Sequence, residues 1–226
     1  MSNFKSRVLV FATFFGSLLA IGLLLVSLTT NHWVRSSAKR VSIPESHGEI
    51  YYGLFNGIKD LNVGYGLRTQ SVHMLSFIQN EPDVMSFWLW LFTALGVGFA
   101  LLASAIAAIA SIIKTASAAK KKGTMILLFV SNISSAMGQI IAFVCWAVQF
   151  YQHLIHNVLA AEDRNLFWYT HGLAYFGYSF WLVVLSTIIV IVNLVLLYIA
   201  HKHEQSFKRF IEPICEDKNQ TAIMLY

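Results

Sequence analysis

Four long apolar stretches contain no Asp, Glu, Lys or Arg, and they constrain the fold of this chain more than any other feature. About 20 apolar residues are enough to cross the ~30 Å hydrocarbon core of a bilayer as a helix. The charge-free stretches are residues 8–34, 84–113, 123–161 and 165–200. We therefore predict four membrane-spanning helices, near residues 8–28, 87–113, 125–150 and 176–200.

Composition agrees with an all-α membrane protein that forms a single tetraspan domain over residues 1–226. The chain is 57% hydrophobic and 12% charged, whereas soluble domains carry about 25% charged residues. The first stretch is longer than the apolar core of a signal peptide, which favours a retained helix. Outside the spans remain two loops, near residues 29–86 and 151–175, and a tail, residues 201–226.

The basic residues predict the orientation of the chain in the membrane. Ten of the sixteen lie before the first span, between the second and third, or after the fourth. Basic residues beside spans collect on the cytoplasmic side. Both termini are therefore expected in the cytoplasm and the loop 29–86 outside. This topology accounts for the net charge of +5 without a nucleic-acid partner.

Small and polar residues within the spans predict how the helices pack. Gly96, Ala100, Ser104 and Ala108 recur at every fourth position of the second span, which gives one face for close helix contact. The third span carries a polar stripe that includes Gln139. Such a stripe can line a solute pathway or hydrogen-bond neighbouring helices. The second interpretation is favoured because transport sites usually contain ionisable residues.

The first outer loop has the composition of a small antiparallel sheet. Residues 49–55 are rich in β-forming side chains, and residues 67–74 alternate in part between apolar and polar. Cys145 and Cys215 fall in the third span and the tail, so no disulfide is expected in the outer loops. The charged run 162–164 in the second loop is expected to be a solvated tip.

Neither a catalytic constellation nor a cofactor motif is recognisable. The nearest metal-ligand pair, His153 and His156, has no Cys, Asp or Glu at ligand spacing. We therefore predict a protein that is not an enzyme and that binds no cofactor or metal.

The tail carries two candidate interaction elements. Apolar residues between 207 and 214 follow helical spacing and predict an interfacial amphipathic helix cut short by Pro213; the alternative is a disordered tail. Met224, Leu225 and Tyr226 have the pattern of a C-terminal PDZ-type ligand, with Tyr226 in the terminal pocket. The alternative is an ordinary disordered end.

Several landmarks resemble the claudin-like tetraspan superfamily, and the clarin family in particular. The residues that carry the likeness in the first outer loop are Trp33, Tyr52, Gly53, Leu54, Phe55, Asn56 and Gly57. Residues 66–68, 179–181 and 223–226 are similar to further clarin motifs. The stretch 175–181 and the cysteine-free loops are most similar to the cysteine-poor third clarin type.

The resemblance implies a non-enzymatic organiser or scaffold of membrane proteins within the plasma membrane, with links to actin-rich protrusions. An auxiliary or trafficking subunit of a channel is the alternative. A channel or transporter is disfavoured by the charge-free spans.

Overall fold

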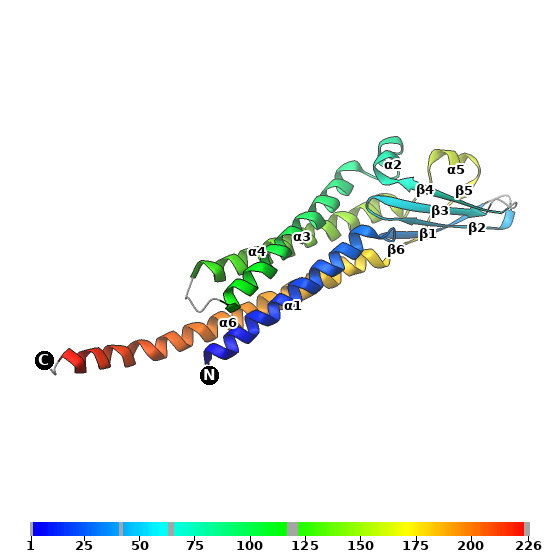
Figure 1. Cartoon of the computed structure of the whole chain (residues 1–226). Coiled ribbons are helices and arrows are strands. Elements are labelled where there is room, and N and C mark those ends of the chain that lie inside the picture. The colour runs from blue at the N-terminus through cyan, green and yellow to red at the C-terminus, as the bar shows by residue number, and fades with distance from the viewer. Residues whose placement is uncertain (1, 41–42, 63–65, 117–121, 224–226) are drawn as a thin grey trace.

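Four long helices run side by side and carry a sheet at one end (Figure 1). The computed structural model describes residues 2–40, 43–62, 66–116 and 122–223. The long helices are α1 (Ser2–Thr29), α3 (Phe87–Ala116), α4 (Lys122–Gln149) and α6 (Tyr178–Ile223). All four contain segments long and apolar enough to cross a membrane. The predicted fold class, a four-helix membrane bundle with a small sheet, is confirmed.

The helices pack in a closed arrangement, with α1 along α3 and α6, and α4 along α3 and α6. Small residues lie in the contact between α3 and α4, whereas many large apolar side chains point outward, as expected for a bundle surrounded by lipid. On α3, for example, the strongly exposed residues are Leu95, Phe99, Leu102, Ile106 and Ile109.

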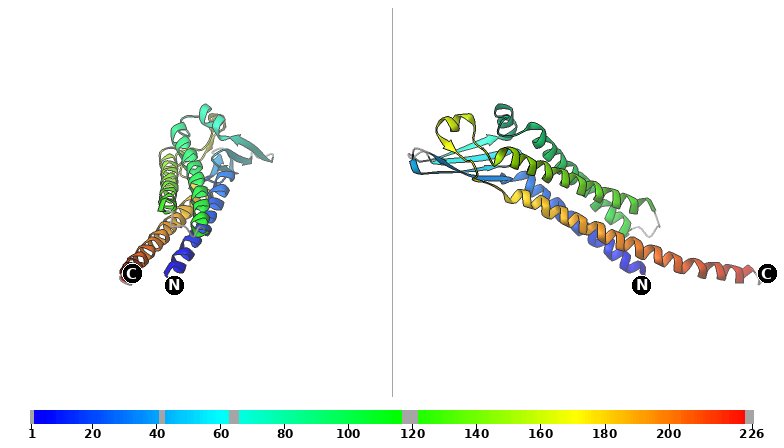
Figure 2. Two further views of the ribbon diagram at one scale, coloured as in Figure 1. Left: turned by 60° about the vertical axis from the view of Figure 1, so that its left-hand side comes forward. Right: turned by 180° about the vertical axis from the view of Figure 1, so that it is seen from behind.

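The loop between α1 and α3 forms most of an antiparallel sheet, as Figure 2 shows from two further sides. Its strands are β1 (Val34–Arg40), β2 (Ile43–Tyr52), β3 (Asn56–Asn62) and β4 (Leu67–His73), followed by the short helix α2 (Met74–Asn80). The loop between α4 and α6 adds the helix α5 (Ala161–Asn165) and the strands β5 (Trp168–Tyr169) and β6 (Ala174–Phe176). Both short strands pair with β1, so the two loops build one sheet. We call this sheet, with α2 and α5, the head.

Several helix ends differ from the sequence-based prediction by a few residues, three of them near the sheet or in the tail. α6 begins at Tyr178 rather than 176, because Phe176 pairs with Val34 in the sheet. α4 continues beyond 150 as a π-helical turn, η1 (Phe150–Leu154). The tail is helical, but α6 runs through Pro213 to Ile223. A proline removes one backbone hydrogen bond of a helix, while the turns on either side keep theirs.

Candidate functional site

Residues 52–57, the continuous part of the motif in the first loop, form the turn that joins β2 to β3 and rests on the end of α1. A β-carbon on Gly53 would lie 2.8 Å from Asn31 Cα and 2.9 Å from Asn56 O. These distances leave no room for a side chain. Gly57 is likewise covered by the ring of Tyr52. Gly53 therefore allows the turn to approach the end of α1 closely, and Gly57 leaves room for the Tyr52 ring on the neighbouring strand.

Two buried tryptophans fasten this turn to the helices. Trp33 donates from its indole nitrogen to Ser27 O at 2.8 Å, and Trp90 donates to Leu54 O at 2.7 Å. Trp33 and Leu54 are fully buried. Trp90 belongs to α3, so the motif is bound to α1 on one side and to α3 on the other. Phe55 is half exposed at the same turn.

Tyr52 connects the motif to the second loop. Its hydroxyl donates to Val158 O at 3.0 Å, and its side chain is fully buried. Burial, followed by the negative charges of Asp163 and Glu81, raises the pKa of Tyr52 far above its ordinary value. The phenol therefore stays protonated and remains a hydrogen-bond donor.

A buried ion pair makes a second connection between the loops. Lys59 Nζ on β3 lies 2.5 Å from Asp163 Oδ2 on α5, and each side chain is only 10% exposed. The expectation that the run 162–164 is a solvated tip is wrong for Asp163. Sequence reasoning missed the pair because its partners lie 104 residues apart and no local pattern links them.

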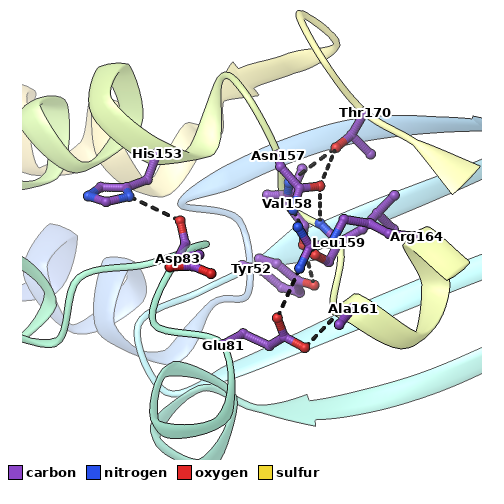
Figure 3. A network of polar contacts seen from close by, with 10 residues as sticks. All are labelled: Tyr52, Glu81, Asp83, His153, Asn157, Val158, Leu159, Ala161, Arg164 and Thr170. Atoms are coloured by element: carbon purple, nitrogen blue, oxygen red, sulfur yellow. Dashed lines mark hydrogen bonds and ion pairs between the residues drawn. The ribbon is translucent and has the colours of Figure 1, made fainter.

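A third connection joins α2 to α5, as the close-up in Figure 3 shows. Glu81 accepts a hydrogen bond from the backbone nitrogen of Ala161 at 2.7 Å, and Arg164 Nη2 lies 3.4 Å from its other oxygen. His153 Nδ1 lies 3.2 Å from Asp83 O beside this network. Polar contacts thus fix the two loops to each other at several points.

The structure places the predicted small-residue row of α3 against α4. A β-carbon on Gly96 would lie 2.7 Å from Gly138 O, and one on Gly138 would lie 2.8 Å from Gly96 O. Ala100, Ser104 and Ala108 are buried along the same helix. Gly98, two residues from Gly96, has open space at its β-carbon position.

The polar stripe of α4 makes hydrogen bonds between helices. Ser135 Oγ lies 2.7 Å from Ser104 Oγ on α3 and accepts a bond from Gln139 Nε2 at 3.0 Å. The side-chain oxygen Oε1 of Gln139 then accepts a hydrogen bond from Thr187 Oγ1 on α6 at 3.1 Å. This chain of bonds links three helices and supports the packing interpretation of the stripe.

Within the described ranges, no three His, Cys, Asp or Glu side chains are grouped so that they could hold a metal ion. The predicted PDZ-type ligand Met224, Leu225 and Tyr226 lies outside the described residues and stays a prediction.

Four spans and one sheet built from both loops at the same end define a tetraspan membrane protein. A family model described as Clarin-2-like matches residues 4–197, and the chain belongs to this clarin family. The predicted clarin resemblance is therefore confirmed, while the assignment to the third type stays a prediction. None of the curated proteins matches the chain.

Proposed function

We propose that the chain is a non-enzymatic organiser of partner proteins in the plasma membrane, with the head outside the cell. The start of α1, the last turn of α3, the first turn of α4 and the last part of α6 lie at the end opposite the head (Figure 1). Basic residues such as Lys5, Lys114 and Lys202 belong to that end. Their position supports a cytoplasmic location for both termini.

The observation that carries this proposal is an exposed apolar tip on the head, formed by Leu166, Phe167 and Tyr169. The three residues are 49%, 64% and 43% exposed. Phe167 has a positive φ of 63°, which costs a residue with a β-carbon about 1–2 kcal/mol. Arg40 on β1 holds the segment by donating from Nε to Leu166 O at 3.0 Å. Strained backbone that presents an apolar side chain to solvent is typical of a contact site.

α6 supports the same function from the other end of the molecule. Its 46 residues make a helix of about 69 Å, more than twice the ~30 Å hydrocarbon core. An ion pair of 3.4 Å between Lys114 Nζ and Glu204 Oε2 fixes α6 to the end of α3. A partner at the head and a partner along the projecting part of α6 would thus be joined by one rigid chain.

Proximity labelling from the cytoplasmic tail in native cells, compared between the parent chain and Phe167→Gly, tests the proposal. Glycine relieves the positive φ, so the variant should unfold at the same or a higher temperature yet lose labelled membrane partners. Phe55→Ser, which removes an aromatic residue that is about half exposed and lies outside the tip, should retain them. An unchanged partner set for Phe167→Gly would contradict the proposal. A stoichiometric channel among the lost partners would favour the auxiliary-subunit alternative.

A further inference from the structure

An open groove lies where the sheet meets the first turn of α6. It has a volume of about 690 Å³, and its lining includes His32, Arg35, Tyr51, Tyr175 and Tyr178. The groove is distinct from the apolar tip, because none of its lining residues belongs to the segment 166–169. Its walls are aromatic, and its one strongly charged group is a guanidinium.

The sheet register explains how these side chains come together. Arg35 on β1 is opposite Tyr51 on β2 and, on its other side, opposite Tyr175 on β6. The guanidinium carbon of Arg35 lies 5.5 Å from the centre of the Tyr51 ring. Below this row, the ring of His32 stacks on Tyr178 with 4.7 Å between ring centres. The groove therefore has an aromatic floor and a cationic side.

The charges around the groove are balanced. Arg35 Nη2 donates to Glu49 Oε1 at 2.7 Å, and Tyr51 also donates to the carboxylate of Glu49. Burial, followed by the charge of Arg35, lowers the pKa of His32, so its ring adds no second positive charge at neutral pH. Arg35 is about half exposed, and a guanidinium has five N–H donors. It can therefore bind a second anion while it keeps Glu49.

The groove lies at the end of α6 that we expect to meet the lipid headgroups. Tyr178 is the first residue of the membrane segment of α6, and aromatic residues gather at membrane–water interfaces. Below it on the same helical face, Trp181 and Leu185 are about half exposed. These side chains offer an apolar path for an acyl chain that continues from a headgroup in the groove.

We propose that this groove binds the zwitterionic phosphocholine headgroup of a membrane lipid. The phosphate accepts hydrogen bonds from Arg35, because guanidinium and phosphate geometries match. The quaternary ammonium lies against the rings of Tyr175 and Tyr178, which attract cations through their faces, and near the carboxylate of Glu49. An anionic headgroup fits less well, because it leaves Glu49 without a positive partner from the lipid.

Native mass spectrometry of the full chain in maltoside micelles, titrated with dioctanoyl phosphatidylcholine or dioctanoyl phosphatidylglycerol, tests the proposal. Phosphatidylcholine should bind about tenfold more tightly than phosphatidylglycerol, and Arg35→Gln or Tyr175→Leu should weaken it by about tenfold. Glu49→Gln should reduce the preference for phosphatidylcholine. The controls Arg68→Gln and Tyr198→Leu replace exposed residues that do not line the groove, and they should leave binding unchanged.

Equal binding of the two lipids would overturn the proposal, as would equal losses in the control variants. Glycerophosphocholine and inorganic phosphate form two further arms of the titration. Both should bind more weakly than phosphatidylcholine; a soluble headgroup or free phosphate that binds as well would overturn a lipid as the occupant. Arg35→Gln and Tyr175→Leu change different strands, so one of them should fold even if the other does not. Thermal unfolding shows which variant is folded, and one folded variant is enough for the test.

Discussion

The head and the helix bundle are held together by different physical means. In the head, a charge pair and a phenol join segments that lie 104 and 106 residues apart in the chain. Two indoles donate hydrogen bonds to backbone carbonyls of α1 and of the β2–β3 turn. In the bundle, the contacts use glycine, alanine and hydroxyl groups on helices that run side by side. Lipid provides no hydrophobic force between helices, so the association of the helices depends on close contact between their backbones. In the head, by contrast, packing excludes water and buries both partners of the Lys59–Asp163 ion pair.

Loss of the close contact between α3 and α4 should have the largest effect on folding. In Gly96→Leu, the new side chain would meet the backbone of α4, since even a β-carbon would lie 2.7 Å from Gly138 O. The two helices must then separate, and we expect loss of the folded bundle and of surface expression. Gly98→Leu is the matched control, because its β-carbon position is open. Equal surface levels and equal thermal stability in detergent for both variants would contradict this packing.

Removal of one partner of the Lys59–Asp163 ion pair should have the next largest effect on the free energy of unfolding. Asp163→Ala leaves Lys59 buried and unpaired, which costs about 3 kcal/mol of unfolding free energy. Replacing both partners, as in Lys59→Met with Asp163→Leu, should recover much of this loss, because no charge stays buried. Glu162→Ala changes the exposed neighbour and should be neutral. Denaturant unfolding followed by tryptophan fluorescence would measure all three; an Asp163→Ala variant as stable as Glu162→Ala would refute the role of the pair.

The Tyr52 hydroxyl should contribute less to the free energy of unfolding than the ion pair does. Tyr52→Phe keeps the ring and removes the donor to Val158 O, so a buried carbonyl loses its partner at a cost of about 1–2 kcal/mol. Tyr175→Phe, which removes an exposed hydroxyl, is the control. Hydrogen exchange of the second loop should increase for Tyr52→Phe alone. Unchanged exchange would show that the bond does not fix the loop.

The comparison between the regions also separates what sequence could predict from what it could not. The spans follow from charge-free stretches, and the row that begins at Gly96 follows from helical periodicity, because both signals are local. The strands β5 and β6 have two and three residues, too few for a periodic pattern. Lys59 on β3 and Asp163 on α5 come from different loops and are brought together by the tertiary fold, so their pairing has no local signal.

The smallest expected effect is that of a single hydrogen bond within the membrane, between Ser104 and Ser135. Ser135 also bonds to Gln139 and to Ala100 O, so its replacement alone measures several contacts together. A double-mutant cycle of Ser104→Ala and Ser135→Ala isolates the pair. We expect a coupling energy of about 0.6 kcal/mol, because serines without this partner find other acceptors in the membrane. Ser27 donates to Ser179 O and serves as the control. The losses of unfolding free energy from Ser104→Ala and Ser27→Ala should be additive. A coupling as large as that of the Lys59–Asp163 pair would erase the difference between the two regions, since hydroxyl groups would then hold the bundle as strongly as charges hold the head.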